Sequence, residues 1–321
     1  MIPYRHQEVS LVEFSKLLSE GNFVVALHRH ADPDAVGSAF AIASCFHASG
    51  IWAPGGFDRN GLALARFLGL SFLPSPAGAR RLLAVDTSDT AQFDSGREAG
   101  MEVLLLDHHF SSPPVMADIY YLDMKSRSCS EIVLDLIDSS GAAIGERQAI
   151  ALLWGAISDT GRFRRGDAST LQKCSRLLSI SGIDMEHALS ITEEQRDTPE
   201  LIAVFKGLER MKHAPAGRYM ICWSGVSSYE SAVASAMVSA GADAAFVASD
   251  RDGDVRLSGR ASQRAVNAGL NLVRVFAAVS VEFGASSGGH AGASVIEARG
   301  DPEALINACV KECTSALASL G

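Results

Sequence analysis

Residues 23–48 read FVVALHRHADPDAVGSAFAIASCFHA, and this stretch decides the fold class. The segment from Phe23 to Leu27 is uniformly apolar, which is typical of a strand buried on both faces. A short polar loop follows, and the small and apolar residues from Ala35 to Ala48 predict a helix. A buried strand that leads through a loop into a helix is the building unit of a parallel sheet with crossover helices.

The same alternation continues through the first half of the chain. Further buried strands are predicted at residues 81–85, 103–106 and 119–122, and a long helix at 146–157. Ser128 and Glu131 fit a capping box that opens a helix with the sequence IVLDLID.

A polar, charged and helix-prone stretch at residues 191–213 separates two patterned regions. Beyond it, strands are predicted at 219–223, 244–249 and 254–260, helices near 229–239, 268–279 and 302–317, and a glycine-rich stretch at 284–292. We therefore predict an α/β protein with a larger N-terminal domain over 1–190, which has a parallel sheet and flanking helices. A helical connector over 191–215 and a smaller C-terminal α/β domain over 216–321 complete it, with the active site in the cleft between the domains.

The composition is that of an ordinary globular protein, with 47% hydrophobic and 20% charged residues in a chain of 321. A net charge of −9 argues against a protein that coats long nucleic-acid duplexes, although a local basic pocket could hold a short anion. The N-terminal stretch MIPYRHQEVSLVEF has no apolar signal core, and no apolar run is long enough to span a bilayer. The six cysteines show no CxxC spacing, so we expect reduced thiols and a cytoplasmic protein without membrane contact.

Acidic and histidine side chains follow successive predicted elements in the first half of the chain. They are His28, Asp32 and Asp34 after the first strand, Asp86 after the second, Asp107, His108 and His109 after the third, and Asp159 after the helix ALLWGAIS. Because ligands of open parallel sheets bind at the carboxyl ends of the strands, we expect these segments to converge on one site. Each residue alone has a simpler interpretation, such as a helix N-cap or a packed histidine pair. Their occurrence in order, each at the end of a buried element, favours a shared site.

Carboxylates gathered at one site repel one another unless cations lie between them. Two divalent cations would balance the charges of Asp32, Asp34, Asp86 and Asp159. Oxygen and imidazole ligands without cysteine favour manganese, magnesium or cobalt over structural zinc, and we expect two Mn²⁺ ions. Two such ions about 3.5–4 Å apart would activate a water and stabilise the leaving oxygen in phosphoryl transfer.

Four segments resemble the motifs of the DHH phosphoesterases, in that family's order. They are LHRHADPDAVGS (27–38), VDTSD (85–89), LLLDHH (104–109) and GAISDTGRFR (155–164). The stretches VRLSGRAS (255–262) and SSGGHAGASV (286–295) are similar to the C-terminal, DHH-associated substrate domain of the branch that acts on short substrates. That branch, within the RecJ-like superfamily, contains oligoribonucleases for very short RNA (nano-RNases) that also dephosphorylate 3′-phosphoadenosine 5′-phosphate.

The resemblance implies a role for each site residue. His28 and Asp32 would ligate one metal, Asp34, His108 and Asp159 the other, and Asp86 would bridge the two. His109 would face the scissile phosphate and stabilise developing negative charge, and Asp107 would orient a histidine ring. Gly288, Gly289 and His290 would help to hold the substrate, because a Gly-Gly turn lets backbone amides approach a phosphate.

Two features of the C-terminal region bear on substrate binding. Arg256, Ser258 and Arg260 alternate, so on a strand they share one face, and we assign Arg260 to substrate binding. The family's motif carries three glycines before its histidine, and here Ser287 occupies the first of these positions.

The expected activity is metal-dependent hydrolysis of phosphoester bonds in short oligoribonucleotides, and of 3′-phosphoadenosine 5′-phosphate. The related branches leave a cyclic-dinucleotide phosphodiesterase, an exopolyphosphatase or a pyrophosphatase open as alternatives. A nucleotide-sensing module is the non-enzyme alternative, but the complete set of ligand residues argues against it. The expected partners are a short RNA or nucleotide and, because homodimers are the commonest oligomers, a second copy of the chain.

Overall fold

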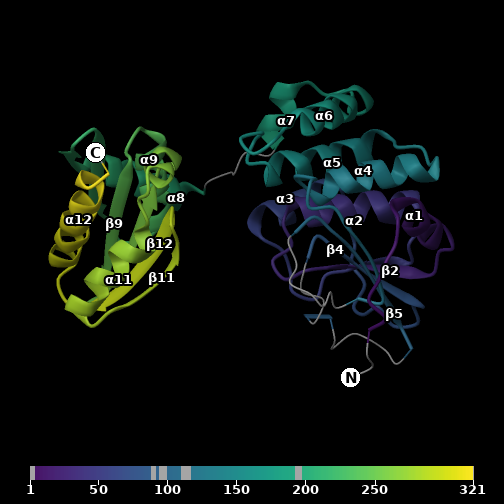
Figure 1. The fold of residues 1–321 in the computed structure, drawn as a ribbon, viewed down its shortest axis with the longest axis horizontal. Helices are drawn as coiled ribbons and strands as arrows, with labels where there is room; N and C mark the ends of the chain where they lie inside the picture. Colours follow the sequence, from purple (N-terminus) through teal and green to yellow (C-terminus); the bar gives the residue numbers. More distant parts are fainter. Residues whose placement is uncertain (1–3, 88–91, 94–99, 110–116, 192–196, 321) are drawn as a thin grey trace. The chain divides into compact units, whose positions relative to one another are not determined.

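The computed structural model describes residues 4–87, 92–93, 100–109, 117–191 and 197–320. The chain forms two compact units, Met1–Glu194 and Gln195–Gly321, each with its own sheet and hydrophobic core (Figure 1). The predicted fold class, a parallel α/β domain followed by a smaller α/β domain, is confirmed.

The described strands of the first unit form one parallel sheet, in the order β1-β6-β5-β4-β2-β3. These strands are β1 (Gln7–Glu8), β2 (Phe23–Leu27), β3 (Gly50–Trp52), β4 (Arg81–Val85), β5 (Glu102–Asp107) and β6 (Ile119–Leu122). The bounds of β2, β4 and β6 are those predicted, because each of these segments is a short, mostly apolar run between polar loops. In the centre of the sheet, β2 and β4 are buried along their whole length.

The described helices of this unit lie on one side of the sheet. They are α1 (Leu11–Ser19), α2 (Pro33–Cys45), α3 (Arg59–Phe67), α4 (Cys129–Ser140), α5 (Glu146–Asp159), α6 (Ala168–Ser181) and α7 (Met185–Ile191). Of these, α6 and α7 pack on α5 instead of on the strands. Alternate strand residues such as Val25 and Leu83 face these helices, while Val24 and Leu82 enter a smaller cluster on the opposite face. Figure 1 shows α4 and α5 lying over α2, with α6 and α7 farther out.

The second unit is built around a mixed sheet in the order β11-β12-β10-β9-β8-β7, in which only the β8–β9 pair is parallel among the described strands. Its strands are β7 (Lys212–Ala216), β8 (Tyr219–Gly225), β9 (Ala244–Arg251), β10 (Asp254–Ala261), β11 (Ser286–His290) and β12 (Ala293–Arg299). Its helices are α8 (Thr198–Glu209), α9 (Glu230–Ser239), α10 (Gln263–Asn267), α11 (Leu272–Phe283) and α12 (Pro302–Ala318). One core cluster lies beneath α11 and α12, and the other beneath α8 and α9.

The structure differs from the sequence prediction at several places in this unit. The glycine-rich stretch is an edge strand, β11, and it pairs with β12, which was not predicted either. The helix predicted at 268–279 begins at Leu272 instead, after the separate short helix α10. The stretch predicted as a connector contains α8 and the start of β7, which belong to the second unit, while residues 192–196 lie outside the described ones.

Two sequence predictions concern the cysteines and membrane contact: that the thiols are reduced, and that no segment spans a bilayer. All six cysteines are free, and Cys309 and Cys313 are packed together in the core beneath α12. Within the described residues, no helix has the length and apolar character that crossing a bilayer requires.

Candidate metal centre

The loop from β2 to α2 brings three predicted ligands to the carboxyl end of the sheet. His28 follows β2 directly, and its ring Nδ1 lies 2.8 Å from the carbonyl oxygen of Arg29. A proton on Nδ1 makes that bond and leaves Nε2 free to bind a metal. Asp32 is the N-cap of α2, where its Oδ1 accepts from the backbone N–H groups of Asp34 and Ala35. Capping uses one oxygen of Asp32, so the other remains available as a ligand.

Asp34 lies in the first turn of α2 and is completely buried. Its Oδ2 accepts from the Cys129 N–H at 2.6 Å, and its Oδ1 accepts from the Ser130 N–H at 2.9 Å and the Ser130 hydroxyl at 2.5 Å. The carboxylate thus receives the first N–H groups of α4, where the helix dipole favours negative charge. Burial, and then the charges of Asp159 and Asp32, nevertheless raise the pKa of Asp34 to about 8.

Two glycines allow α2 and α5 to cross closely enough to bring Asp34 and Asp159 together. A Cβ added to Gly37 would lie 2.3 Å from the Ala151 carbonyl oxygen. A Cβ added to Gly155 would lie 2.2 Å from the Ser130 hydroxyl and 2.8 Å from Asp34 Oδ1. Neither distance is sterically allowed, so glycine is required at both positions.

Asp86 follows β4 directly in a left-handed conformation, with φ of 58°, and only 4% of it is exposed. A non-glycine residue with this backbone is uncommon and is held by its surroundings. Here the Asp86 N–H donates to the Leu106 carbonyl of the neighbouring strand at 3.0 Å. Burial, with the charges of the surrounding aspartates, raises the pKa of Asp86 well above its ordinary value.

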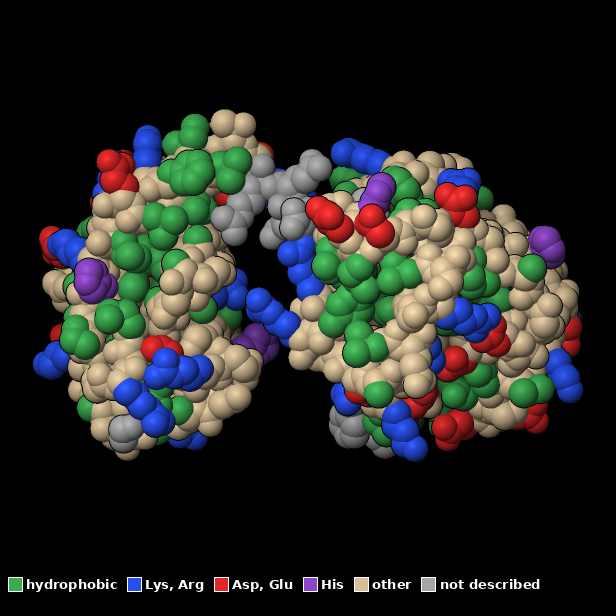
Figure 2. All heavy atoms as spheres, turned by 90° about the horizontal axis from the view of Figure 1, so that it is seen from above, with side chains coloured by type: hydrophobic (Ala, Val, Ile, Leu, Met, Phe, Trp, Pro, Cys, Tyr) green, Lys and Arg blue, Asp and Glu red, His purple; other side chains and the backbone are tan. Residues whose placement is uncertain are grey.

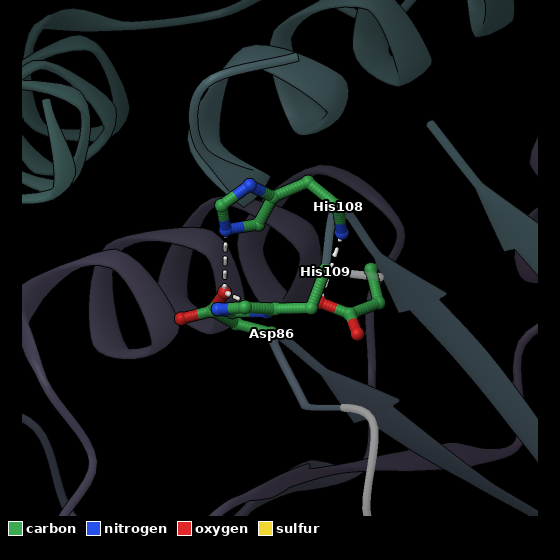
Figure 3. A group of neighbouring side chains, drawn as sticks. Asp86, His108 and His109 are labelled. Atoms are coloured by element: carbon green, nitrogen blue, oxygen red, sulfur yellow. Dashed lines mark hydrogen bonds and ion pairs between the residues drawn. The ribbon is translucent and has the colours of Figure 1, made fainter. Parts of the chain in front are cut away.

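The residues that end β5 surround the Asp86 carboxylate (Figure 3). His108 Nε2 lies 3.3 Å from Asp86 Oδ1, and His109 Nδ1 lies 3.7 Å from the same oxygen. Asp107 is fully buried, and its Oδ1 accepts from the His108 backbone N–H and from His109 Nδ1, each at 2.8 Å. Of the two rings, Asp107 therefore orients that of His109, and this hydrogen bond is the main cause that raises the pKa of His109.

His108 differs from His109 in its surroundings. Its ring is hydrogen-bonded to the Ser126 backbone, which leaves Nε2 directed at Asp86 and at Asp159 Oδ2, 3.3 Å away. Burial, and then the charge of His109, lower the pKa of His108, so its ring is neutral at neutral pH. Burial raises the pKa of Asp159 at the end of α5.

The arrangement fits a pair of divalent cations. Among the described residues, Asp86 Oδ1 and His108 Nε2 are buried without a hydrogen-bond partner, and these two acceptors face each other at 3.3 Å. Such a pair is unfavourable unless a cation lies between them. The six predicted ligands form two groups with atoms within 4.8 Å of one another: His28, Asp32 and Asp86, and Asp34, His108 and Asp159. His108 Nε2 and Asp86 Oδ1 join these groups, as expected for a bridging Asp86.

An open pocket of about 540 Å³ lies over this cluster. Its lining residues are His28, Arg29, Asp32, Asp86, Thr87, Gln92 and His109. His109 is half-exposed there, whereas His108 is buried behind it. Of the two histidines, His109 is therefore the one that an incoming ligand can reach.

The predicted substrate residues lie in the second unit. Arg260 on β10 and His290 on β11 both pair with Ala293 of β12, so they share one face of the sheet. The Arg260 guanidinium donates to Ser231 Oγ at 2.7 Å. Gly288 and Gly289 lie on the same exposed edge strand, and Gly289 has φ of 142°, which only glycine adopts readily. Ser287 alternates with His290 and lies on the other face, so its side chain is directed away from this row.

Several residues that shape the site were not singled out from the sequence. Ser130, Gly37 and Gly155 act through contacts between distant parts of the chain, which no local pattern reveals. The Ser128 cap could have located the N–H groups that hold Asp34, because it marks the start of α4. One of the two hydrogen bonds of the predicted capping box is present: the Glu131 N–H donates to Ser128 Oγ. The Glu131 carboxylate accepts from Thr170 Oγ1 instead of from the backbone of Ser128.

Comparison with known proteins agrees with this geometry. Residues 22–156 match the N-terminal domain of the DHH family, and these residues carry every predicted ligand except Asp159. Together with the Asp and His cluster, the match shows that this segment, less than half of the chain, is similar to the N-terminal domain of the DHH family.

Individual relatives extend the likeness. An uncharacterized protein of Methanocaldococcus jannaschii is 28% identical over 320 residues, which cover 94% of each chain. The bifunctional oligoribonuclease and PAP phosphatase NrnA of Thermus thermophilus is 30% identical over 156 residues, less than half of either chain at 45%. An exopolyphosphatase-related protein of Bacteroides fragilis has the same fold, with a TM-score of 0.70 at 17% identity over 97% of both chains. The exonuclease RecJ bound to manganese has a TM-score of 0.51 at 16% identity, over 97% of this chain and 94% of RecJ.

Proposed function

We propose that the protein hydrolyses short oligoribonucleotides, and 3′-phosphoadenosine 5′-phosphate, with two Mn²⁺ ions at the cluster around Asp86. The observation that carries this proposal is the pair of ligand groups joined at Asp86, beneath a pocket that His109 lines. A cytoplasmic location, where such substrates occur, is part of the proposal and is compatible with six free thiols.

The ligand residues have a defined task in this reaction. His28, Asp32 and Asp86 would hold one cation, and Asp34, His108, Asp159 and Asp86 the other. Bound there, the cations would activate water and stabilise the charge of the leaving oxygen. The neutral ring of His108 and the buried carboxylates are suited to cations and not to anions.

His109 would contact the phosphate itself. Its Nδ1 is bonded to Asp107, which fixes the ring and favours its charged form by raising its pKa. On this half-exposed ring, the Nε2–H can then donate to a phosphoryl oxygen and stabilise the negative charge that develops there. Asp107 acts on the reaction through this ring, as a positioning residue.

One similarity in sequence and one in fold support the proposed substrates. NrnA, a bifunctional oligoribonuclease and PAP phosphatase, is similar to the chain over part of its length. The Bacteroides fragilis protein, described as exopolyphosphatase-related, shares the whole fold but little sequence, so polyphosphate is the second candidate substrate.

We also propose that the second unit binds the far end of the substrate, through Arg260, Gly288, Gly289 and His290. The row formed by Arg260 and His290 supports this role, because a guanidinium and an imidazole on one face can bind a phosphate together. On the face that Figure 2 shows, basic side chains are interspersed with acidic ones over both units, which suits a short anion better than a long duplex.

A substrate panel tests the proposal. Purified protein with manganese, and in parallel with magnesium, is given pApA, 24-residue RNA, 3′-phosphoadenosine 5′-phosphate, cyclic dinucleotides, polyphosphate and pyrophosphate. We expect pApA and 3′-phosphoadenosine 5′-phosphate to be hydrolysed fastest, and His290→Ala to slow pApA more than bis-p-nitrophenyl phosphate. Faster hydrolysis of the long RNA or of polyphosphate would show that the substrate assignment is wrong.

A further inference from the structure

Arg29 lies in the loop of the metal centre, and its backbone is held on both sides. Its N–H donates to Gln92 Oε1 at 2.8 Å, and its carbonyl oxygen accepts from His28 Nδ1 at 2.8 Å. Gln92 is held in turn, because its Nε2 donates to Thr87 Oγ1 at 3.1 Å. The same bonds that orient a metal ligand therefore also fix the position of Arg29.

The stem of the Arg29 side chain packs against Gly55. A Cβ added to Gly55 would lie 2.4 Å from Arg29 Cγ and 2.6 Å from Arg29 Cα. Only glycine leaves room for this stem. The side chain is thus directed from a fixed backbone, and Arg29 lines the pocket together with Asp32, Asp86 and His109.

The guanidinium of Arg29 makes no ion pair or hydrogen bond with the residues that the structure describes, although two aspartates line the same pocket. An arginine that served to balance Asp32 or Asp86 is expected within about 4 Å of a carboxylate oxygen. Once cations neutralise the carboxylates, Arg29 and His109 are the positive groups that remain in the pocket lining. This charge favours an anion in the pocket.

We infer that Arg29 binds a second phosphate group of the substrate, next to the one that is hydrolysed. The scissile phosphate would be bound by His109 and by the cations that the ligand groups would hold, and a pocket of about 540 Å³ has room for more than one phosphoryl group. The planar guanidinium suits a terminal phosphate, which it can bind with two parallel hydrogen bonds. The inference rests on the proposed phosphoester hydrolysis and favours substrates that carry a second phosphate group, as pApA and 3′-phosphoadenosine 5′-phosphate both do.

Equilibrium binding tests this role without turnover. Methylenediphosphonate carries two phosphonates joined by a carbon that resists hydrolysis, and methylphosphonate carries one. Both are titrated calorimetrically into manganese-loaded wild type, Arg29→Gln, Arg29→Lys and Arg66→Gln. Arg66 is an exposed arginine of α3 that does not line the pocket, which makes it the matched control. Metal content is checked by elemental analysis in each protein.

We expect Arg29→Gln to weaken methylenediphosphonate binding by about 10-fold or more, with Arg29→Lys between it and the wild type. Methylphosphonate binding should change little, and Arg66→Gln should match the wild type for both ligands. Equal weakening for both ligands would place Arg29 at the scissile phosphate, and no weakening would mean that it binds neither; either result overturns the inference. Neither ligand is hydrolysed, so this binding test does not depend on turnover. If the wild-type protein cleaved no nucleotide, that result would contradict the proposed function and would leave the inference about Arg29 standing.

Discussion

At the scale of single residues, the site is a set of buried ionisable groups whose charges divalent cations would balance. Asp34 and Asp86 have raised pKa values because they are buried near other carboxylates. His108 has a lowered pKa for the related reason that burial disfavours its charged form. Bound metal ions would offset the free-energy cost of burying several ionised carboxylates together. Metal binding and the stability of the fold are therefore linked.

This linkage predicts a pH dependence for the metal-free protein. The pKa of Asp34 rises from 3.8 to about 8 on folding, so between these values the folded chain keeps a proton that the unfolded chain releases. Asp34 alone should therefore lower the stability by up to about 1.4 kcal/mol per pH unit as pH rises from about 4 to about 8, and Asp86 adds to this slope. A slope of this size corresponds to a fall in Tm of about 2–4 °C per pH unit, which calorimetry can measure after treatment with a chelator.

Two controls accompany that measurement. Manganese-loaded protein should lose most of the slope. Its metal-bound carboxylates are ionised in the folded chain, as they are in the unfolded chain above about pH 4, so folding no longer takes up a proton. Asp34→Asn should reduce the slope of the metal-free protein, leaving the part due to Asp86. An unchanged slope in both would mean that Asp34 is not the group responsible.

The two histidines of the DHH segment should respond differently to truncation. His108→Ala removes a ligand that faces both Asp86 and Asp159, so metal binding should be impaired. His109→Ala removes an exposed ring held by Asp107, so the metals should stay bound while turnover falls by about 10²–10³. Elemental analysis and kcat, measured on the same preparations, distinguish the two. Equal metal loss in both variants is the contrary result.

At the scale of elements, the crossing of α2 over α5 positions the metal ligands of both helices. Gly155→Ala should destabilise the protein by about 1–3 kcal/mol and weaken manganese binding, because its Cβ would meet Ser130 Oγ and Asp34. Chemical denaturation and metal titration measure these two effects. Gly225→Ala is a suitable control, since its Cβ would meet nothing closer than 4.0 Å.

A double variant separates the causes. Ser130→Ala together with Gly155→Ala removes the hydroxyl that lies 2.2 Å from the new Cβ, so part of the lost stability should return. Manganese binding should stay weak, because Asp34 has also lost the hydroxyl that holds it. Full additivity of the two single changes would contradict the contact.

The elements also show what the sequence could and could not reveal. Apolar runs predicted β2 and β4 to the residue, because a strand buried on both faces has no polar alternation to blur its ends. The strand β11 was missed, since the residues SSGGH are exposed and polar and form a strand only by pairing with β12. The ligand residues could be predicted from their places after buried elements, whereas Arg29 and Gly155 depend on contacts with residues far away in the sequence.

At the scale of the whole molecule, the ligands come from five elements of the first unit, over residues 28–159. A site assembled in this way exists only when the complete parallel sheet and its covering helices are folded. We propose that this unit holds two divalent cations joined at Asp86. Removing Asp86 should then affect both ions, while removing a ligand of one group should affect one.

The most direct measurement is the number of manganese ions bound per chain, determined by elemental analysis after loading and gel filtration. We expect two ions in the wild type, about one in Asp34→Ala, and fewer than one in Asp86→Ala, which loses a ligand of both groups. Asp138→Asn, which changes a surface carboxylate of α4 paired with Arg176, should retain two. Two ions retained by Asp86→Ala, or a single ion in the wild type, would contradict the shared two-metal centre.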